Sequence, residues 1–184
     1  MLELRLHGRG GQGSVVASKI LADAVMKGGK FVQAFPEFGV ERRGAPVFAF
    51  VRIDDKPILL KSKIYTPDHV IVLDPTLIES INITEGLKDN GIILINSELP
   101  PSEFKFEGNY RVMTVDAKRI AIKYRLGSKA SPIVNTAILG AVIKAIPVAT
   151  MDNLIEAIKD GVPVKIEENI AAAKEAYESL IKGE

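Results

Sequence analysis

The sequence has no cysteine and only two histidines among its 184 residues. Without cysteine the chain cannot form disulfides, thiolate zinc sites or a cysteine nucleophile, and it cannot hold an iron–sulfur cluster through its own thiolates. His7 and His69 lie in or beside predicted strands, and neither has a neighbouring metal-ligand partner. A structural imidazole bonded to backbone is the favoured interpretation of His7, although this residue is close enough to the glycine-rich segment described below to contact a ligand. No metal site is predicted.

An excess of charge and a long hydrophobic run are also missing. The chain has 24 Lys and Arg against 23 Asp and Glu, which gives a formal net charge of +1. A nearly neutral chain lacks the global field typical of a nucleic-acid-binding protein, so any anion site must be local. No apolar run approaches the roughly 18 residues that a membrane-spanning helix needs, and Met1 leads directly into a strand-like segment instead of a secretory signal. We therefore expect a cytoplasmic protein with no nucleic-acid or membrane partner.

The periodicity of the sequence predicts an α/β protein. Strand and helix patterns alternate throughout, which indicates one domain over residues 1–184 with a Rossmann-like three-layer fold, a mostly parallel sheet and one β-hairpin. The expected strands cover residues 2–7, 31–35 (ended by Pro36), 69–73, 91–96 and 111–115. The expected hairpin joins 47–53 to 58–64 through a turn at 54–57. The expected helices cover about 14–26, 117–126, 132–146, 151–160 and 165–182.

A glycine-rich segment, Gly8-Arg9-Gly10-Gly11-Gln12-Gly13, joins the first strand to the first helix. Its spacing is that of the G-x-G-x-x-G turn of dinucleotide-binding folds, whereas a Walker A loop is excluded because Ser14 follows directly. Glycines let a phosphate approach the backbone N–H groups, and the first helical turn adds unpaired donors and partial positive charge. We expect residues Gly8 to Ser14 to bind phosphate, with Arg9 either adding charge or pointing into solvent. The alternative is a tight turn whose glycines serve only packing.

Two further groups of residues are expected at the carboxyl edge of the sheet, where doubly wound folds bind their ligands. Glu41, Arg42 and Arg43 form a dense charge cluster in the loop after the second strand, and they either bind a ligand or form a solvated surface. Asn135 either projects its amide toward this edge or bonds within its helix. Glu37 comes late for the ribose-binding acid of a dinucleotide fold.

Catalytic machinery is not recognisable in the sequence. It contains no metalloprotease, catalytic-triad or nucleophile-elbow pattern. Asp74 precedes Pro75, so it is better explained as a helix N-cap than as a catalytic acid. A phosphate site without acid–base groups favours a binding subunit whose chemistry lies on another chain.

Three segments together resemble the gamma subunit of pyruvate, or related 2-oxoacid, ferredoxin oxidoreductases. They are Gly8–Gly13, Phe38-Gly39-Val40-Glu41-Arg42-Arg43-Gly44 and Asn135-Thr136-Ala137-Ile138-Leu139-Gly140-Ala141. The resemblance runs in order from about Leu2 to Ala145, and the chain length fits a free-standing gamma chain. The second segment is more similar to the pyruvate and branched-chain members of the family than to the 2-oxoglutarate or indolepyruvate members. The residue that follows this segment is Ala45, where many relatives have a second glycine.

The resemblance implies a subunit of an enzyme that decarboxylates a 2-oxoacid, transfers the acyl group to coenzyme A and reduces ferredoxin. It implies alpha, beta and delta partner subunits, with thiamine diphosphate on alpha and beta and iron–sulfur clusters on beta and delta. This chain would hold none of these groups, would contribute to coenzyme A binding and assembly, and would be inactive alone. The implied coenzyme A-binding residues are Gly8 to Ser14, Glu41, Arg42, Arg43 and Asn135.

Two other functions remain open from the sequence. The chain could be purely a scaffold, in which the glycines make a packing turn and Glu41, Arg42 and Arg43 form ion pairs with a partner subunit. It could also be a free-standing NAD-dependent Rossmann enzyme, which Glu37 suggests and the missing catalytic set disfavours.

Overall fold

The computed structural model describes residues 1–37 and 44–183. The strands in these ranges are β1 (Leu2–Arg9), β2 (Phe31–Glu37), β3 (Pro46–Asp54), β4 (His69–Val72), β5 (Ile92–Asn96), β6 (Arg111–Val115) and β7 (Ile181–Lys182). The α-helices are α1 (Ser14–Lys27), α2 (Ala117–Lys123), α3 (Ala137–Ala145), α4 (Met151–Gly161) and α5 (Ile166–Glu178). Two 3-10 helices, η1 (Pro75–Glu79) and η2 (Pro101–Glu103), complete the described elements.

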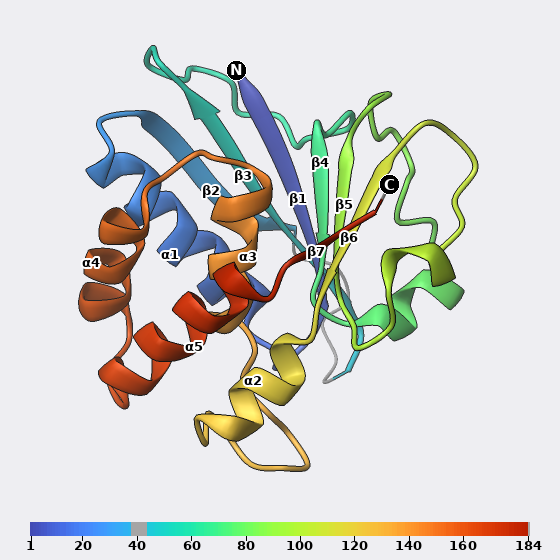
Figure 1. Cartoon of the computed structure of the whole chain (residues 1–184). Helices are drawn as coiled ribbons and strands as arrows, with labels where there is room; N and C mark the ends of the chain where they lie inside the picture. Colours follow the sequence, from blue (N-terminus) through green and yellow to red (C-terminus); the bar gives the residue numbers. More distant parts are fainter. Residues whose placement is uncertain (38–43, 184) are drawn as a thin grey trace.

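The strands form one mixed sheet in the order β2-β3-β1-β4-β5-β6-β7 (Figure 1). β1, β4, β5 and β6 are parallel to their neighbours in this core, whereas β3 runs antiparallel to both β1 and β2. β7 is antiparallel to β6 and brings the C-terminal end of the described chain back to the sheet. Strands β1, β2, β4, β5 and β6 therefore all point the same way, and their carboxyl ends meet at one edge.

The two faces of the sheet are covered differently. All five described α-helices contribute to one large hydrophobic core on the face that carries Leu4, Leu6 and Ile71. On the other face Val70 and Val72 pack with residues from η1 and from the irregular segments that follow it. The sheet thus lies between a layer of α-helices and a layer of 3-10 helices and extended chain, and the predicted α/β class with a parallel core is confirmed.

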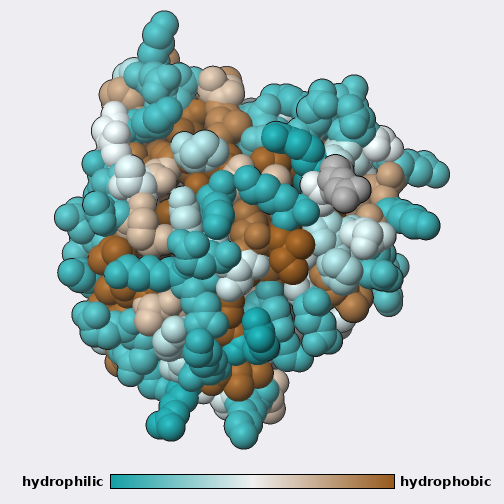
Figure 2. Space-filling view, viewed as in Figure 1, coloured by the Kyte–Doolittle hydropathy of each residue, from teal (hydrophilic) through white to brown (hydrophobic). Residues whose placement is uncertain are grey.

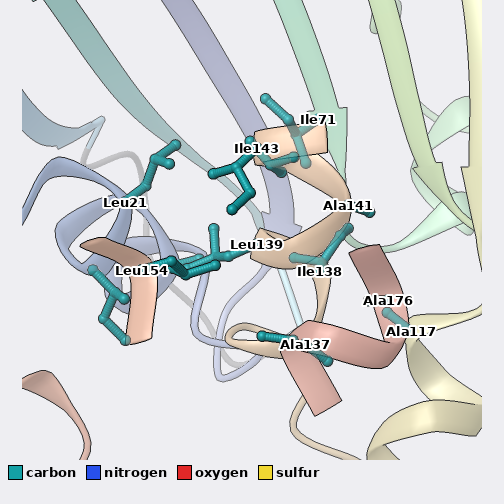
Figure 3. Packing of buried hydrophobic residues seen from close by; sticks show 14 of the residues in the cluster. Leu21, Ile71, Ala117, Ala137, Ile138, Leu139, Ala141, Ile143, Leu154 and Ala176 are labelled. Carbon is teal, nitrogen blue, oxygen red and sulfur yellow. The ribbon is translucent and has the colours of Figure 1, made fainter. Parts of the chain in front are cut away.

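Helix α3 lies at the centre of the helical layer. Leu139 of α3 is fully buried in the same core as Leu21 of α1 and Leu154 of α4 (Figure 3). Gly140 of α3 allows close approach to α5, since a Cβ at this position would lie 1.7 Å from the carbonyl oxygen of Ala173. On the outside of this layer, hydrophobic residues appear as separate patches among hydrophilic ones (Figure 2). No helix in the described part of the chain is both long and apolar enough to cross a membrane.

The predicted hairpin is wrong in its second strand. β3 pairs with β2, with Phe31 opposite Asp54 and Glu37 opposite Phe48, while residues 58–64 form no strand. This segment is held by side chains instead, because the fully buried Arg52 donates to the carbonyl oxygen of Ser62. A run of apolar residues therefore lies beside the sheet without joining its ladder.

Several predicted boundaries also differ from the structure, among them the end of β2 and the start of α3. Pro36 does not end β2 but lies within it, which an edge strand tolerates because its outer side needs no ladder hydrogen bond. Helix α3 begins at Ala137 and not at residue 132, since the preceding chain is used in a turn in which the N–H of Ile133 donates to the carbonyl oxygen of Leu126. Asn135 is consequently placed just before the helix.

Candidate anion-binding site

The glycine-rich loop lies at the carboxyl edge of the sheet, between the end of β1 and the start of α1. β1 is flanked by β3 on one side and by β4 on the other, and the chain leaves it through α1 toward β2. The ends of β2 and β4 and the start of β3 lie at the same edge. This is the position at which open parallel sheets bind ligands, in the crevice where the strand order reverses.

The backbone of the loop exposes its donors. Gly11 and Gly13 have left-handed φ values of 93° and 79°, which residues with a Cβ rarely adopt. Gly13 is the N-cap residue of α1 and provides no side-chain cap. Among residues 1–37 and 44–183, no acceptor is present for the N–H groups of Gly11, Gly13 and the first helical residues Ser14, Val15 and Val16. These groups and the positive end of the helix dipole suit an anion.

The space beside the loop differs between its glycines. A Cβ on Gly11 would meet no described atom within 4 Å, so no other described residue covers the backbone at this position. A Cβ on Gly8 would lie 3.1 Å from Cβ of Ser14, which explains the need for glycine where the strand passes the helix. Gly8 therefore serves packing, while Gly11 leaves its backbone uncovered by any residue of the described ranges.

Asn135 packs directly on Gly13. A Cβ on Gly13 would lie only 2.5 Å from Nδ2 of Asn135, so this glycine is required for both its backbone conformation and its neighbour. The side chain of Asn135 is buried, and its Oδ1 accepts a 2.8 Å hydrogen bond from the N–H of Thr136. The other side-chain atom, the Nδ2 donor, consequently faces the N-terminus of α1. The structure brings Asn135 and the loop together, whereas the sequence left open whether its amide points to this edge or bonds locally.

A polar network ties the loop to the end of β4. The carboxylate of Asp74 accepts hydrogen bonds from Nε of Arg9 at 3.1 Å and from Nε2 of Gln12 at 2.7 Å. The same guanidinium donates to the carbonyl oxygen of Gly44 and to the hydroxyl of Thr76. Arg9 therefore lies along the surface of the protein at this edge, where it is partly exposed and paired.

The charge state of Asp74 follows from these contacts. Burial alone raises the pKa of Asp74, but the hydrogen bonds from Thr76 and Gln12 and the charge of Arg9 favour the carboxylate. The net result is a pKa below the usual range for an aspartate. The group stays ionised at neutral pH and balances the charge of Arg9.

His7 lies on the opposite face of β1 from the large core and is kept neutral. Burial is the main cause that lowers its pKa to about 3, and the neighbouring charge of Arg5 adds to the effect. Nε2 of His7 accepts a 2.9 Å hydrogen bond from Nε of Arg5, and the ring meets Phe48 edge-on. The interpretation of His7 as a buried structural imidazole fits this geometry, although its partner is a side chain and not backbone.

The sequence predicted only one of the two structural roles of Asp74. Its expected N-cap role is confirmed, because its side chain accepts from the N–H of Thr76. Its contacts with Arg9 and Gln12 were not foreseen. The available signal was its position after β4, a strand that lies parallel and next to β1.

The other candidate residues from the sequence are the charge cluster after β2 and Glu37. Glu41, Arg42 and Arg43 lie outside the described residues. Glu37, the candidate ribose-binding acid, instead forms a 2.7 Å ion pair with Nζ of Lys63.

Comparison with known proteins assigns the chain to a family. The model of the family described as pyruvate ferredoxin/flavodoxin oxidoreductase matches residues 3–179. The pyruvate/ketoisovalerate oxidoreductases common subunit gamma of Pyrococcus furiosus is 52% identical over 182 residues, which cover 97% of this chain and 96% of that protein.

Two solved structures extend the comparison. Pyruvate oxidoreductase subunit PORC of Thermotoga maritima is 34% identical, with a TM-score of 0.85. The match covers 100% of this chain and 98% of that chain. A 2-oxoglutarate:ferredoxin oxidoreductase of Magnetococcus marinus, solved with 2-oxoglutarate, coenzyme A and succinyl-CoA bound, is 22% identical with a TM-score of 0.72. It covers 96% of this chain, which spans 30% of that longer chain, and at this identity it shows a shared fold.

The sheet, its helical layer and the strand–glycine turn–helix unit define a Rossmann-like α/β domain. More specifically, the chain belongs to the pyruvate ferredoxin/flavodoxin oxidoreductase family, and it is the gamma subunit of such an enzyme. The resemblance drawn from the three sequence segments is confirmed.

Proposed function

We propose that this gamma subunit contributes to coenzyme A binding in the assembled oxidoreductase, and that the loop Gly8–Ser14 and Asn135 hold a phosphate of coenzyme A. The observation that carries the proposal is the uncapped N-terminus of α1, where the left-handed Gly13 and the open surface at Gly11 leave backbone donors accessible. Nδ2 of Asn135 adds a side-chain donor at the same point.

The choice of coenzyme A is supported by chemistry and by a relative. Coenzyme A carries several phosphates, and the acyl transfer of a 2-oxoacid:ferredoxin oxidoreductase consumes it. The Magnetococcus marinus enzyme with the same fold was solved with coenzyme A bound. Arg9 remains a candidate for additional positive charge near the phosphate, as do Arg42 and Arg43 in the adjoining loop.

The remaining chemistry is proposed to lie on partner chains. In this arrangement alpha and beta subunits hold thiamine diphosphate, beta and delta subunits hold the iron–sulfur clusters, and ferredoxin accepts the electrons in the cytoplasm. The lack of cysteine fits this division, because this chain has no thiolate for a cluster. Pyruvate or a branched-chain 2-oxoacid is the proposed substrate, in line with the names of the relatives.

The test compares two nearly isosteric replacements of Gly11 in the reconstituted enzyme. Gly11→Asp and Gly11→Asn impose the same strain at a left-handed position, but only aspartate adds a negative charge beside the proposed phosphate. We expect Gly11→Asp to raise the apparent KM for coenzyme A about tenfold above that of Gly11→Asn, the equivalent of about 1.4 kcal/mol. The KM for the 2-oxoacid should be the same in both variants. Equal KM values for coenzyme A in the two variants would contradict the proposal.

A scaffold role is the second candidate. It is favoured by the guanidinium of Arg9, which is bound to Asp74, Thr76 and Gly44 of its own chain and so makes the loop part of a packed surface. A scaffold role predicts that Arg42→Glu releases the gamma subunit from the complex during gel filtration, with the KM for coenzyme A unchanged in the fraction that stays assembled.

A further inference from the structure

We propose that Asp74 is the positioning residue of the glycine-rich loop: its carboxylate holds the side chains of Arg9 and Gln12, and thereby fixes the loop conformation that presents the backbone donors. This inference rests on the proposed coenzyme A site and adds to it a residue that does not itself touch the phosphate.

Both oxygens of the carboxylate are used. Oδ2 accepts from Nε of Arg9 at 3.1 Å and from Nε2 of Gln12 at 2.7 Å. Oδ1 accepts from the N–H of Thr76 at 3.0 Å and from its hydroxyl at 2.6 Å. Four donors therefore converge on one acceptor-only group, and hydrogen bonds to an ionised group are the stronger kind.

Gln12 transmits this contact into the loop. Its backbone N–H donates to the carbonyl oxygen of Arg9 at 3.0 Å, and its Oε1 accepts from the N–H of Arg9 at 2.8 Å. Because Asp74 can only accept, it fixes the orientation of the Gln12 amide, with Nε2 toward the carboxylate and Oε1 toward the backbone. Both ends of the amide are thus occupied, and the turn between Arg9 and Gln12 is closed.

Arg9 connects the carboxylate to the adjoining segments. Its guanidinium donates to the carbonyl oxygen of Gly44 at 3.1 Å and to Oγ1 of Thr76 at 2.8 Å. The loop is joined to the same segment through its backbone, since the N–H of Gly10 donates to the carbonyl oxygen of Ala45. An asparagine at position 74 would offer one acceptor oxygen and an NH₂ group. With its NH₂ group toward the loop, the donors of Arg9 and Gln12 would both face another donor, and with its oxygen toward the loop, the N–H of Thr76 would. In either orientation the negative charge that pairs with Arg9 is lost.

The test uses Asp74→Asn in the assembled enzyme, with Asp116→Asn as the matched control. Asp116 follows β6 at the same edge of the sheet and caps α2 by accepting from the N–H of Arg119, but it has no hydrogen bond to the loop. We expect Asp74→Asn to raise the KM for coenzyme A about tenfold, with kcat and the KM for the 2-oxoacid changed less than twofold. Asp116→Asn should leave all three constants within about twofold. A KM for coenzyme A that is unchanged in Asp74→Asn, although Gly11→Asp raises it, would overturn the inference.

A rescue experiment separates positioning from general damage to the fold. Gln12→Glu places two carboxylates at a 2.7 Å contact and should also raise the KM for coenzyme A. Adding Asp74→Asn removes one of the two negative charges, so that one carboxylate again faces one amide donor. The double variant should therefore bind coenzyme A better than Gln12→Glu alone. If the increases in the KM for coenzyme A caused by the two single substitutions combine in the double variant, the proposed contact between Gln12 and Asp74 is wrong.

Hydrogen exchange distinguishes this inference from the coenzyme A proposal. Amide exchange at Arg9, Gly10 and Gln12, whose N–H groups are hydrogen-bonded in the loop, should be faster in Asp74→Asn than in the wild-type enzyme, without any ligand present. If exchange accelerates but neither Asp74→Asn nor Gly11→Asp changes the KM for coenzyme A, the ligand assignment fails and the positioning of the loop stands. If Gly11→Asp raises the KM and Asp74→Asn changes neither exchange nor KM, only the role of Asp74 fails.

Discussion

At the scale of single residues, the contact between Gly13 and Asn135 defines the candidate site. The glycine is needed for a left-handed backbone, and it also leaves the space that Nδ2 of Asn135 occupies. The sequence could indicate the glycine, because the G-x-G-x-x-G spacing places it at the start of a helix. It could not indicate that Asn135 lies on that glycine, because the two residues are brought together only when α1 and α3 pack on the same face of the sheet.

A substitution at Asn135 tests the donor at the loop. Asn135→Asp keeps the oxygen that accepts from Thr136 and replaces the Nδ2 donor by a carboxylate oxygen. We expect the KM for coenzyme A to rise about tenfold or more, because a hydrogen bond to a charged group is lost and a like charge is added. Steady-state kinetics of the reconstituted enzyme give this value. The control is Asn153→Asp in α4, near Gly28 at the other end of α1, which should leave the KM unchanged.

The buried His7 predicts a pH dependence of stability. Its folded-state pKa of about 3 lies below the usual value of 6.5, so below about pH 6.5 the unfolded chain binds a proton that the native imidazole does not. Stability is therefore full above pH 6.5 and falls toward pH 3, with a contribution from this residue of up to about 1.4 kcal/mol per pH unit. Burial also lowers the pKa of His69, which acts in the same direction.

The variant His7→Gln isolates this contribution, because glutamine retains an acceptor for Arg5 but does not titrate. Urea unfolding of the purified chain at pH 7 and pH 5 should show a smaller loss of stability for the variant than for the wild type. Identical losses in the two proteins would show that His7 is not the group responsible.

At the scale of elements, the sequence predicted those helices and strands whose packing is local. The alternation of Leu2, Leu4 and Leu6 correctly gave β1, and the apolar stripe after Gly13 gave α1. The hairpin partner was wrong because residues 58–64 have the hydrophobicity of a strand but are fixed by the buried side chain of Arg52. The short β7 was read as the end of the last helix, since its pairing with β6 depends on a residue distant in sequence, Met113.

The packing of α3 against α5 predicts one position that tolerates no side chain. Gly140→Ala would place a Cβ 1.7 Å from the backbone oxygen of Ala173, so the two helices would have to separate. We expect a loss of about 3 kcal/mol in the free energy of unfolding, the upper end for overpacking of a core. Gly161→Ala at the end of α4 is the control, because its Cβ would meet only the side chain of Ile20 at 3.1 Å. Equal unfolding midpoints for the two variants in urea would contradict the close approach.

At the scale of the whole molecule, the proposed phosphate site is assembled from segments that are far apart in the sequence. Its sheet edge brings together the loop after β1, Asp74 after β4 and Asn135 before α3. The chain belongs to the pyruvate ferredoxin/flavodoxin oxidoreductase family, in which it is one subunit of a larger enzyme. Fold class and family could be derived from the sequence, whereas the convergence of these three segments required the strand order.

Main-chain donors at the start of α1 are proposed to hold a phosphate of coenzyme A, and amide hydrogen exchange of the assembled enzyme is the decisive test of this binding. With saturating coenzyme A, exchange at Gly11 and from Gly13 to Val16 should slow, while exchange at the opposite end of α1, around Gly28, stays the same. If coenzyme A slows exchange only in other subunits and leaves residues 11–16 unaffected, the account of this site is contradicted.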